Sequence, residues 1–102
     1  IGEFQAALAR DPTSPNARAN LGQIRLDQGS AMLETRRFAD AAAALRTAVD
    51  LMPDSAEAHN DLGVALASMG RVNEAAAHFQ RAVSLKPDFA EAQKNLNQAS
   101  GS

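Results

Sequence analysis

The chain has 102 residues, with ten Lys or Arg against twelve Asp or Glu, and a formal net charge of −2. This mild acidity excludes the basic surface that nucleic acids and anionic membranes attract, and no apolar run is long enough to span a bilayer. The absence of Cys excludes disulfides and thiolate metal sites. Ala is the most frequent residue and strand-favouring residues are sparse, so we expect an all-α fold. Without a membrane span we expect a soluble protein; its compartment is open, and we favour the cytoplasm.

Residues 4–12 match the end of a helix that recurs later in the chain. Their Phe-x2-Ala-x4-Pro spacing is that of residues 79–87. We therefore interpret residues 1–11 as the second helix of a preceding helix pair, ended by Pro12. The chain starts with Ile1 instead of Met, and cloning sites commonly encode the dipeptides at its ends, so we expect a fragment or a processed protein.

A longer unit follows over residues 15–55. Its Leu21 and Ala41 correspond to Leu62 and Ala75 of the next unit. Leu21 and Ala41 lie seven residues farther apart in the sequence than Leu62 and Ala75 do. This difference implies seven additional residues between the two helices of the unit, around Gly29–Thr35.

Two structures of this insertion are open. Seven residues are almost two helical turns, so the apolar face stays in phase, and we favour one helix from about Pro15 to Glu34. The alternative is a helix that ends at Gly29 and continues as a loop, since Gly-Ser often breaks a helix. In the longer helix, Met32 and Leu33 either fold back on their own unit, which we favour, or provide a surface for self-association.

The unit over residues 56–89 is the most regular. The segments around Pro53 and Pro87 agree with each other position by position. Gly70 fits the left-handed end of a first helix, and Asp54 and Asp88 have the spacing of N-terminal caps. Residues 90–98 then repeat the start of a first helix and form a trailing, capping helix.

The unit contains His59-x2-Leu62-Gly63-x2-Leu66 and then Ala75-x3-Phe79-x2-Ala82-x4-Pro87. This pattern resembles the tetratricopeptide repeat family, whose repeat period of about 34 residues is also the interval from Pro53 to Pro87. The resemblance implies an α-solenoid of antiparallel helix pairs in a right-handed superhelix, in one array over residues 1–102. Gly22 and Gly63 each lie inside a helix at a cost of about 1 kcal/mol relative to Ala, so we expect close helix contacts at both glycines.

No arrangement of residues predicts catalysis, and we expect no enzyme activity, no cofactor and no metal site. The chain lacks a nucleophile elbow, a phosphate-binding glycine loop and a zinc-protease motif. We interpret His59 as a packing residue and place His78 on an outer helix face.

The resemblance implies that first helices line a concave face that binds a protein or an extended peptide. On each first helix, we expect the residues that point away from the second helix to form this face. They are Asn16, Asn20, Gln23, Asp27, Glu57, Asn60, Asp61, Val64, Glu91, Lys94, Asn95 and Gln98.

Two kinds of recognition can be compared with this face. The Lys and Asn clamp by which chaperone-binding members hold a terminal carboxylate is replaced here by uncharged or acidic residues, among them Gln23, Asp61 and Glu91. The asparagine ladder of O-linked N-acetylglucosamine transferase, which bonds a peptide backbone, is similar to Asn20, Asp61 and Asn95. The alternative is that these side chains do not bind a peptide, and only contact water on this face or form hydrogen bonds within the solenoid.

The sequence therefore predicts a scaffold or adaptor module of bacterial type that binds a protein or peptide, without nucleic acid or membrane partners. One alternative is the non-catalytic repeat region of a larger enzyme such as a glycosyltransferase. Another is a homo-oligomer assembled through the terminal helices.

Overall fold

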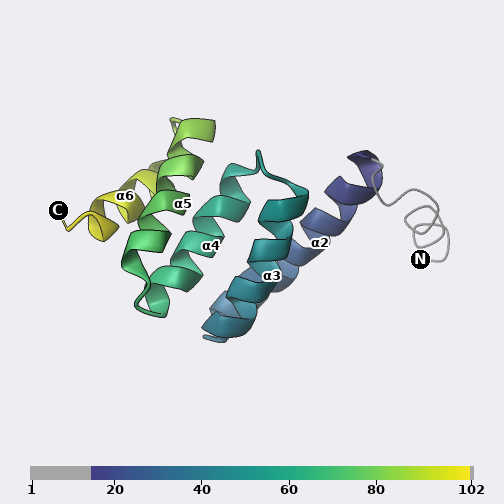
Figure 1. Ribbon diagram of the computed structural model, residues 1–102, viewed down its shortest axis with the longest axis horizontal. Helices are drawn as coiled ribbons and strands as arrows, with labels where there is room; N and C mark the ends of the chain where they lie inside the picture. Colours follow the sequence, from purple (N-terminus) through teal and green to yellow (C-terminus); the bar gives the residue numbers. More distant parts are fainter. Residues whose placement is uncertain (1–14, 102) are drawn as a thin grey trace.

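The computed structural model describes residues 15–101, which form five α-helices and contain no strand (Figure 1). The helices are α2 (Pro15–Glu34), α3 (Phe38–Leu51), α4 (Ala56–Ser68), α5 (Val72–Leu85) and α6 (Ala90–Ala99). α2 packs on α3 and α4 packs on α5, and the pairs stack because α3 also contacts α4 and α5 contacts α6. The all-α solenoid expected from the sequence is confirmed. The helix expected over residues 1–11 lies outside the described residues.

The turn inside each helix pair recurs after one repeat period. The amide of Arg37 donates to the carbonyl of Met32 at 2.9 Å, and the amide of Arg71 donates to that of Leu66 at 2.9 Å. Gly70 has a φ of 83°, which confirms its left-handed conformation. Its counterpart in the first pair is Arg36, with a φ of 62°. The first turn therefore keeps the same geometry without a glycine.

The seven additional residues lie at the start of α2. α2 and α4 end one repeat period apart, at Glu34 and Ser68, but α2 begins seven residues earlier than that period requires. The continuous helix is confirmed and the loop alternative is wrong. Our placement of the insertion between the two helices is also wrong, because Leu21-Gly22 only resembles the Leu62-Gly63 pair in sequence.

The glycine that corresponds to Gly63 in space is Gly29. A Cβ atom on Gly63 would lie 2.5 Å from Cε1 of Phe79, and one on Gly29 would lie 2.5 Å from Cγ of Leu45. Phe79 and Leu45 are buried at equivalent places on the second helices. In each pair, the large side chain therefore packs directly on the backbone of the first helix. The sequence-based expectation of close contact is confirmed for Gly22 as well, where a Cβ would lie 2.5 Å from Cγ of Met52.

A continuous core of small and medium apolar side chains joins the pairs. Leu26, Leu45, Leu62 and Leu66 are its largest fully buried apolar residues, surrounded by alanines. Met32 and Leu33 are partly buried and pack against this core. The fold-back on their own unit and the alternative of self-association stay predictions.

The helix caps differ from the sequence-based prediction. Ser55, not Asp54, caps α4, since its hydroxyl accepts a hydrogen bond from the amide of Ala58 at 3.2 Å. The residue before α6 is Phe89, which makes no side-chain cap, so Asp88 does not act as one either. Both carboxylates lie one residue too early to reach the helix amides as N-caps. Across residues 15–101, no helix has both the length and the apolar character that crossing a membrane requires.

Substitution of Gly63 by Ala tests the contact inside a pair. The new methyl group would lie 2.5–2.9 Å from three ring atoms of the buried Phe79, so the ring would have to shift from its packed position. We expect Gly63→Ala to lower the free energy of unfolding by about 1–2 kcal/mol in urea titrations, despite the better helix propensity of Ala. Gly22→Ala is the matched control, because the flexible, partly exposed Met52 can swing away. An equal or larger loss in the control contradicts this account.

Candidate inner-face binding site

Hydrogen bonds connect the first helices α2, α4 and α6 along one face, which we call the inner face. The hydroxyl of Ser30 on α2 donates to Oδ2 of Asp61 on α4 at 2.8 Å. Nδ2 of Asn95 on α6 donates to Oδ1 of Asn60 on α4 at 3.0 Å, and Nδ2 of Asn60 donates to Oε2 of Glu91 at 3.3 Å. These bonds hold neighbouring first helices side by side.

The residues expected on this face differ in exposure. Asp61, Val64 and Asn95 are half-buried, and Asn60 is only 1% exposed. The remaining eight, which are Asn16, Asn20, Gln23, Asp27, Glu57, Glu91, Lys94 and Gln98, are exposed. The prediction that Asn60 belongs to the binding site is therefore wrong. Its amide forms the hydrogen bonds between α4 and α6 and is shielded from a ligand.

The repeat geometry also changes the asparagine ladder. The positions one repeat period before and after Asp61 are Asp27 and Asn95. Asn20 lies seven residues, or about two turns, before Asp27 on the same stripe of α2. The ladder positions therefore carry two carboxylates and one amide. Asp61 and Asn95 both bond within the solenoid, as the alternative to peptide binding described.

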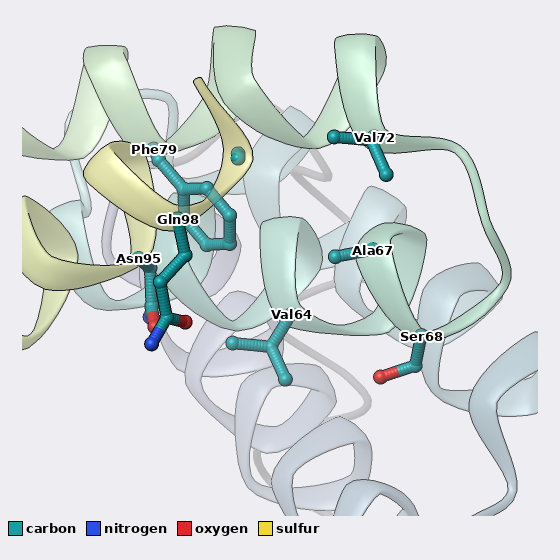
Figure 2. A pocket seen from close by; sticks show the side chains of 8 residues that line it. Val64, Ala67, Ser68, Val72, Phe79, Asn95 and Gln98 are labelled. Atoms are coloured by element: carbon teal, nitrogen blue, oxygen red, sulfur yellow. The ribbon is translucent and has the colours of Figure 1, made fainter. Parts of the chain in front are cut away.

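A notch opens at the C-terminal end of the inner face, between α4, α5 and α6 (Figure 2). It encloses about 290 Å³ and combines apolar groups with the side-chain amides of Asn95 and Gln98. Its lining residues are Val64, Ala67, Ser68, Val72, Phe79, Asn95, Gln98 and Ala99.

The short length of α6 explains the notch. α6 ends at Ala99, three residues before the position equivalent to the end of α4, and leaves the last turn of α4 uncovered. Val72 is 41% exposed there. Sequence reasoning identified Val64, Asn95 and Gln98 but missed Ala67, Val72, Phe79 and Ala99. The sequence signal that could have revealed these residues is the early end of the helical pattern over residues 90–98.

Acidic groups dominate the inner face. Within residues 15–101, this face carries the carboxylates of Asp27, Glu57, Asp61 and Glu91 and one cation, Lys94. The ion pairs found among residues 15–101 instead involve arginines of the second helices and connecting turns: Arg37 with Asp40, Arg46 and Arg71 with Glu74, and Arg81 with Asp54.

Asp61 shows the electrostatic consequence. Burial raises the pKa of its carboxyl, the hydrogen bond from Ser30 lowers it, and the nearby charges of Glu57 and Glu91 raise it further, with a net increase. A carboxylate among other carboxylates is stabilised by a positive ligand group and destabilised by a negative one. The inner face therefore carries an excess of negative charge around Asp61.

The two histidines meet between α4 and α5. Nδ1 of His59 lies 3.1 Å from Nδ1 of His78, and Nε2 of His59 lies 2.9 Å from the carbonyl oxygen of Pro53. The carbonyl can only accept, so His59 carries its proton on Nε2 and accepts from His78 through Nδ1. His59 is buried, as its packing role predicts, but His78 is half-buried and not on an outer face. No set of three metal-ligating side chains occurs within the described part of the chain.

A family model described as "Tetratricopeptide repeat" matches residues 26–90. No curated protein sequence matches. The solved structures similar to this one include the first TPR of Spaghetti (RPAP3) bound to the HSP90 peptide SRMEEVD, with 24% identity and a TM-score of 0.71 over 96% of this chain and 72% of that chain.

Two further solved structures have the same fold. The first TPR domain of human RPAP3 has 24% identity and a TM-score of 0.70, over 96% of this chain and 72% of that one. The crystal structure of MamA has 22% identity and a TM-score of 0.68, over 96% of this chain and 73% of that one. At these identities, the comparison establishes the fold.

The histidine pair predicts a pH dependence of stability. Burial lowers the pKa of His78 below 6.5, with His59 and Arg46 adding to the effect and Glu74 opposing it. The unfolded chain then binds more protons than the folded one just below pH 6.5, so the stabilising contribution is complete above that pH and is lost as the pH falls toward the lower folded-state pKa. We expect Tm to fall between pH 7.5 and 5.5, and to fall less in His78→Gln. An unchanged pH profile in that variant contradicts the assignment.

Proposed function

Because the chain belongs to the tetratricopeptide repeat family, we propose that it is a protein-interaction module that holds an extended segment of a partner on its inner face. The observation that carries this proposal is the notch, where apolar surface adjoins exposed polar groups. Binding sites for peptides combine these two features, since apolar contacts supply affinity and amides fix the backbone. No catalytic arrangement competes with this interpretation among residues 15–101.

The notch suggests how a peptide is held. Its volume of about 290 Å³ is sufficient for one large apolar side chain, with Phe79 as part of the wall. Gln98 is exposed at the rim and can donate to and accept from a peptide backbone. Asn95 has already committed one donor to Asn60, so we assign it the weaker role of accepting through its oxygen.

The charge of the inner face supports selection against acidic peptides. The Spaghetti domain is described with the acidic peptide SRMEEVD. In this chain, Asp27, Asp61 and Glu91 would repel such a ligand, and Lys94 is the only cation among the described residues of the face. We therefore propose a neutral or basic segment as the partner.

Self-assembly through the C-terminal helix has less support. On α4, the positions that face α5 are His59, Gly63 and Leu66. On α6 and its C-cap, the equivalent positions are the polar and exposed Gln93, Asn97 and Ser100. A polar outer face of this kind is typical of a helix that caps a solenoid. The enzyme alternative has no specific observation in its favour.

Peptide selection tests the proposed function. Peptides enriched from a random phage-displayed library on the full chain are synthesised with a fluorophore, and their affinity is measured by anisotropy. We expect the double variant Val64→Ala with Gln98→Ala to weaken binding about ten-fold or more, since it removes apolar wall and amide together. Gln80→Ala on the exposed face of α5 is the control. Equal affinity for the chain and the double variant, or no enrichment, contradicts the proposal.

A pair of synthetic peptides tests the charge preference separately. SRMKKVD differs from SRMEEVD only in that two lysines replace two glutamates. We expect the lysine peptide to bind about ten-fold more tightly at low salt, and the difference to shrink at high salt as charges are screened. A preference for SRMEEVD contradicts the proposed partner chemistry.

A further inference from the structure

Two hydrogen bonds in series connect Glu91 to Asn95 through the buried amide of Asn60. Nδ2 of Asn60 donates to Oε2 of Glu91 at 3.3 Å, and Oδ1 of Asn60 accepts from Nδ2 of Asn95 at 3.0 Å. Asn60 lies on α4 and is only 1% exposed, whereas Glu91 and Asn95 lie about one turn apart on α6. Both ends of the Asn60 amide are therefore used between the two helices.

The direction of both hydrogen bonds is set at Glu91. Its carboxylate can only accept, so the group of Asn60 that faces it must be the NH₂ group. The oxygen of Asn60 then faces Asn95, and this oxygen also only accepts, so Asn95 must turn its own NH₂ group toward Asn60. One acceptor at Glu91 therefore fixes the orientation of two successive amides.

Asn95 is the residue of this series that reaches the notch. It lines the notch together with Gln98 on the α6 side, across from Val64 and Ser68 of α4 (Figure 2). Among residues 15–101, its one side-chain hydrogen bond is the one that Nδ2 donates to Asn60. The oxygen Oδ1 is therefore the end of the Asn95 amide that remains for a ligand, and a group in the notch meets an acceptor there.

The interface between α2 and α4 shows that stacking does not require a buried amide at this place. One repeat period before Asn60, α2 carries Leu26, which is 2% exposed, and the bond between α2 and α4 joins Ser30 to Asp61 instead. Burial of an amide costs free energy that burial of an apolar side chain does not. The amide of Asn60 therefore has a role beyond packing.

We propose that Glu91 and Asn60 are positioning residues, which act through Asn95 to make the notch a site for a hydrogen-bond donor beside an apolar side chain. This inference rests on the proposed function. The donor is a backbone N–H of the bound segment, whose apolar side chain lies against Val64 and Phe79. An acceptor at the same place is disfavoured, because it would meet the oxygen of Asn95 and leave both groups without a hydrogen bond.

The variant Glu91→Lys reverses the direction of the series. An ammonium group can only donate, so we expect it to attract Oδ1 of Asn60 and to turn the NH₂ group of Asn60 toward Asn95. Asn95 then accepts through its oxygen and presents its NH₂ group to the notch. The notch thus changes from an acceptor site to a donor site, although none of its lining residues is replaced.

Glu57→Lys is the matched control for the change in charge. Glu57 lies one repeat period before Glu91, and each is an exposed acidic residue in the first turn of its helix. The hydrogen bonds that Asn60 makes within residues 15–101 involve Glu91 and Asn95, not Glu57. Both variants therefore change the charge of the inner face equally, and only Glu91→Lys changes the direction of the hydrogen bonds.

Amide-to-ester substitution in a peptide tests the preference for a donor. Each backbone N–H of SRMKKVD is replaced in turn by an ester oxygen, and the affinity of each analogue is compared with that of the parent peptide by fluorescence anisotropy. We expect one ester to bind the wild-type chain about ten-fold more weakly than the parent peptide, because it lacks the donor. This ratio falls to about one in Glu91→Lys and persists in Glu57→Lys.

The ratio is taken within each variant, so a general loss of affinity caused by the added positive charge cancels. The proposal is overturned if the wild-type chain shows no such ester position, if the ratio persists in Glu91→Lys, or if it disappears in both variants.

NMR spectra of the free chain separate this inference from the proposed function. In the wild-type chain, we expect the strongest side-chain NOEs of the Asn60 NH₂ protons to the γ-methylene protons of Glu91. In Glu91→Lys, we expect them to the β-methylene protons of Asn95 instead, and an unchanged pattern overturns the reversal. If the NOEs change as expected but SRMKKVD does not bind the wild-type chain, the proposed function fails, and the donor preference of the notch fails with it.

Discussion

The close approach of a large side chain to a glycine governs the geometry of each helix pair. Phe79 against Gly63 and Leu45 against Gly29 bring the second helix onto the backbone of the first. Close-packed interiors tolerate little change in such contacts, so they fix how the two helices of a unit are spaced. The alanine-rich faces between units then allow the pairs to stack, and the first helices are left to line one surface together.

The positions of these glycines also explain where sequence reasoning failed. Leu21-Gly22 has the expected pair of residues, and it led to an insertion between the helices. In the structure, Gly22 contacts the end of α3 at Met52, and Gly29 makes the contact that defines the unit. A motif of two residues cannot distinguish these places, because seven residues return a helix to nearly the same face.

Other features were predictable to different degrees. Hydrophobic periodicity and the prolines predict the helices, since these signals act within a helix. The bonds of Asn60 and the pairing of His59 with His78 join different helices and depend on helix spacing to within an ångström. No local pattern encodes that distance. The inner face could be assigned by helical phase, but the buried asparagine within it could not be separated from its exposed neighbours.

Two surfaces with different chemistry result from this architecture. Four arginines pair with acids on the second helices and turns, while four carboxylates remain together on the first helices, those of Asp27, Glu57, Asp61 and Glu91. Side-chain hydrogen bonds between the first helices hold this acidic surface in place, and they involve only some of its polar side chains. An acidic face that ends in a notch with apolar walls agrees with the proposed partner, a segment with apolar and basic side chains.

Chemical-shift mapping is the most direct measurement of this central claim. In amide spectra of the ¹⁵N-labelled full chain, titration with SRMKKVD is expected to shift the signals of Asp61, Val64 and Gln98 and to leave those of Gln80 and Thr47 on the second helices in place. Shifts confined to α3 and α5, with an unperturbed inner face, would contradict the account.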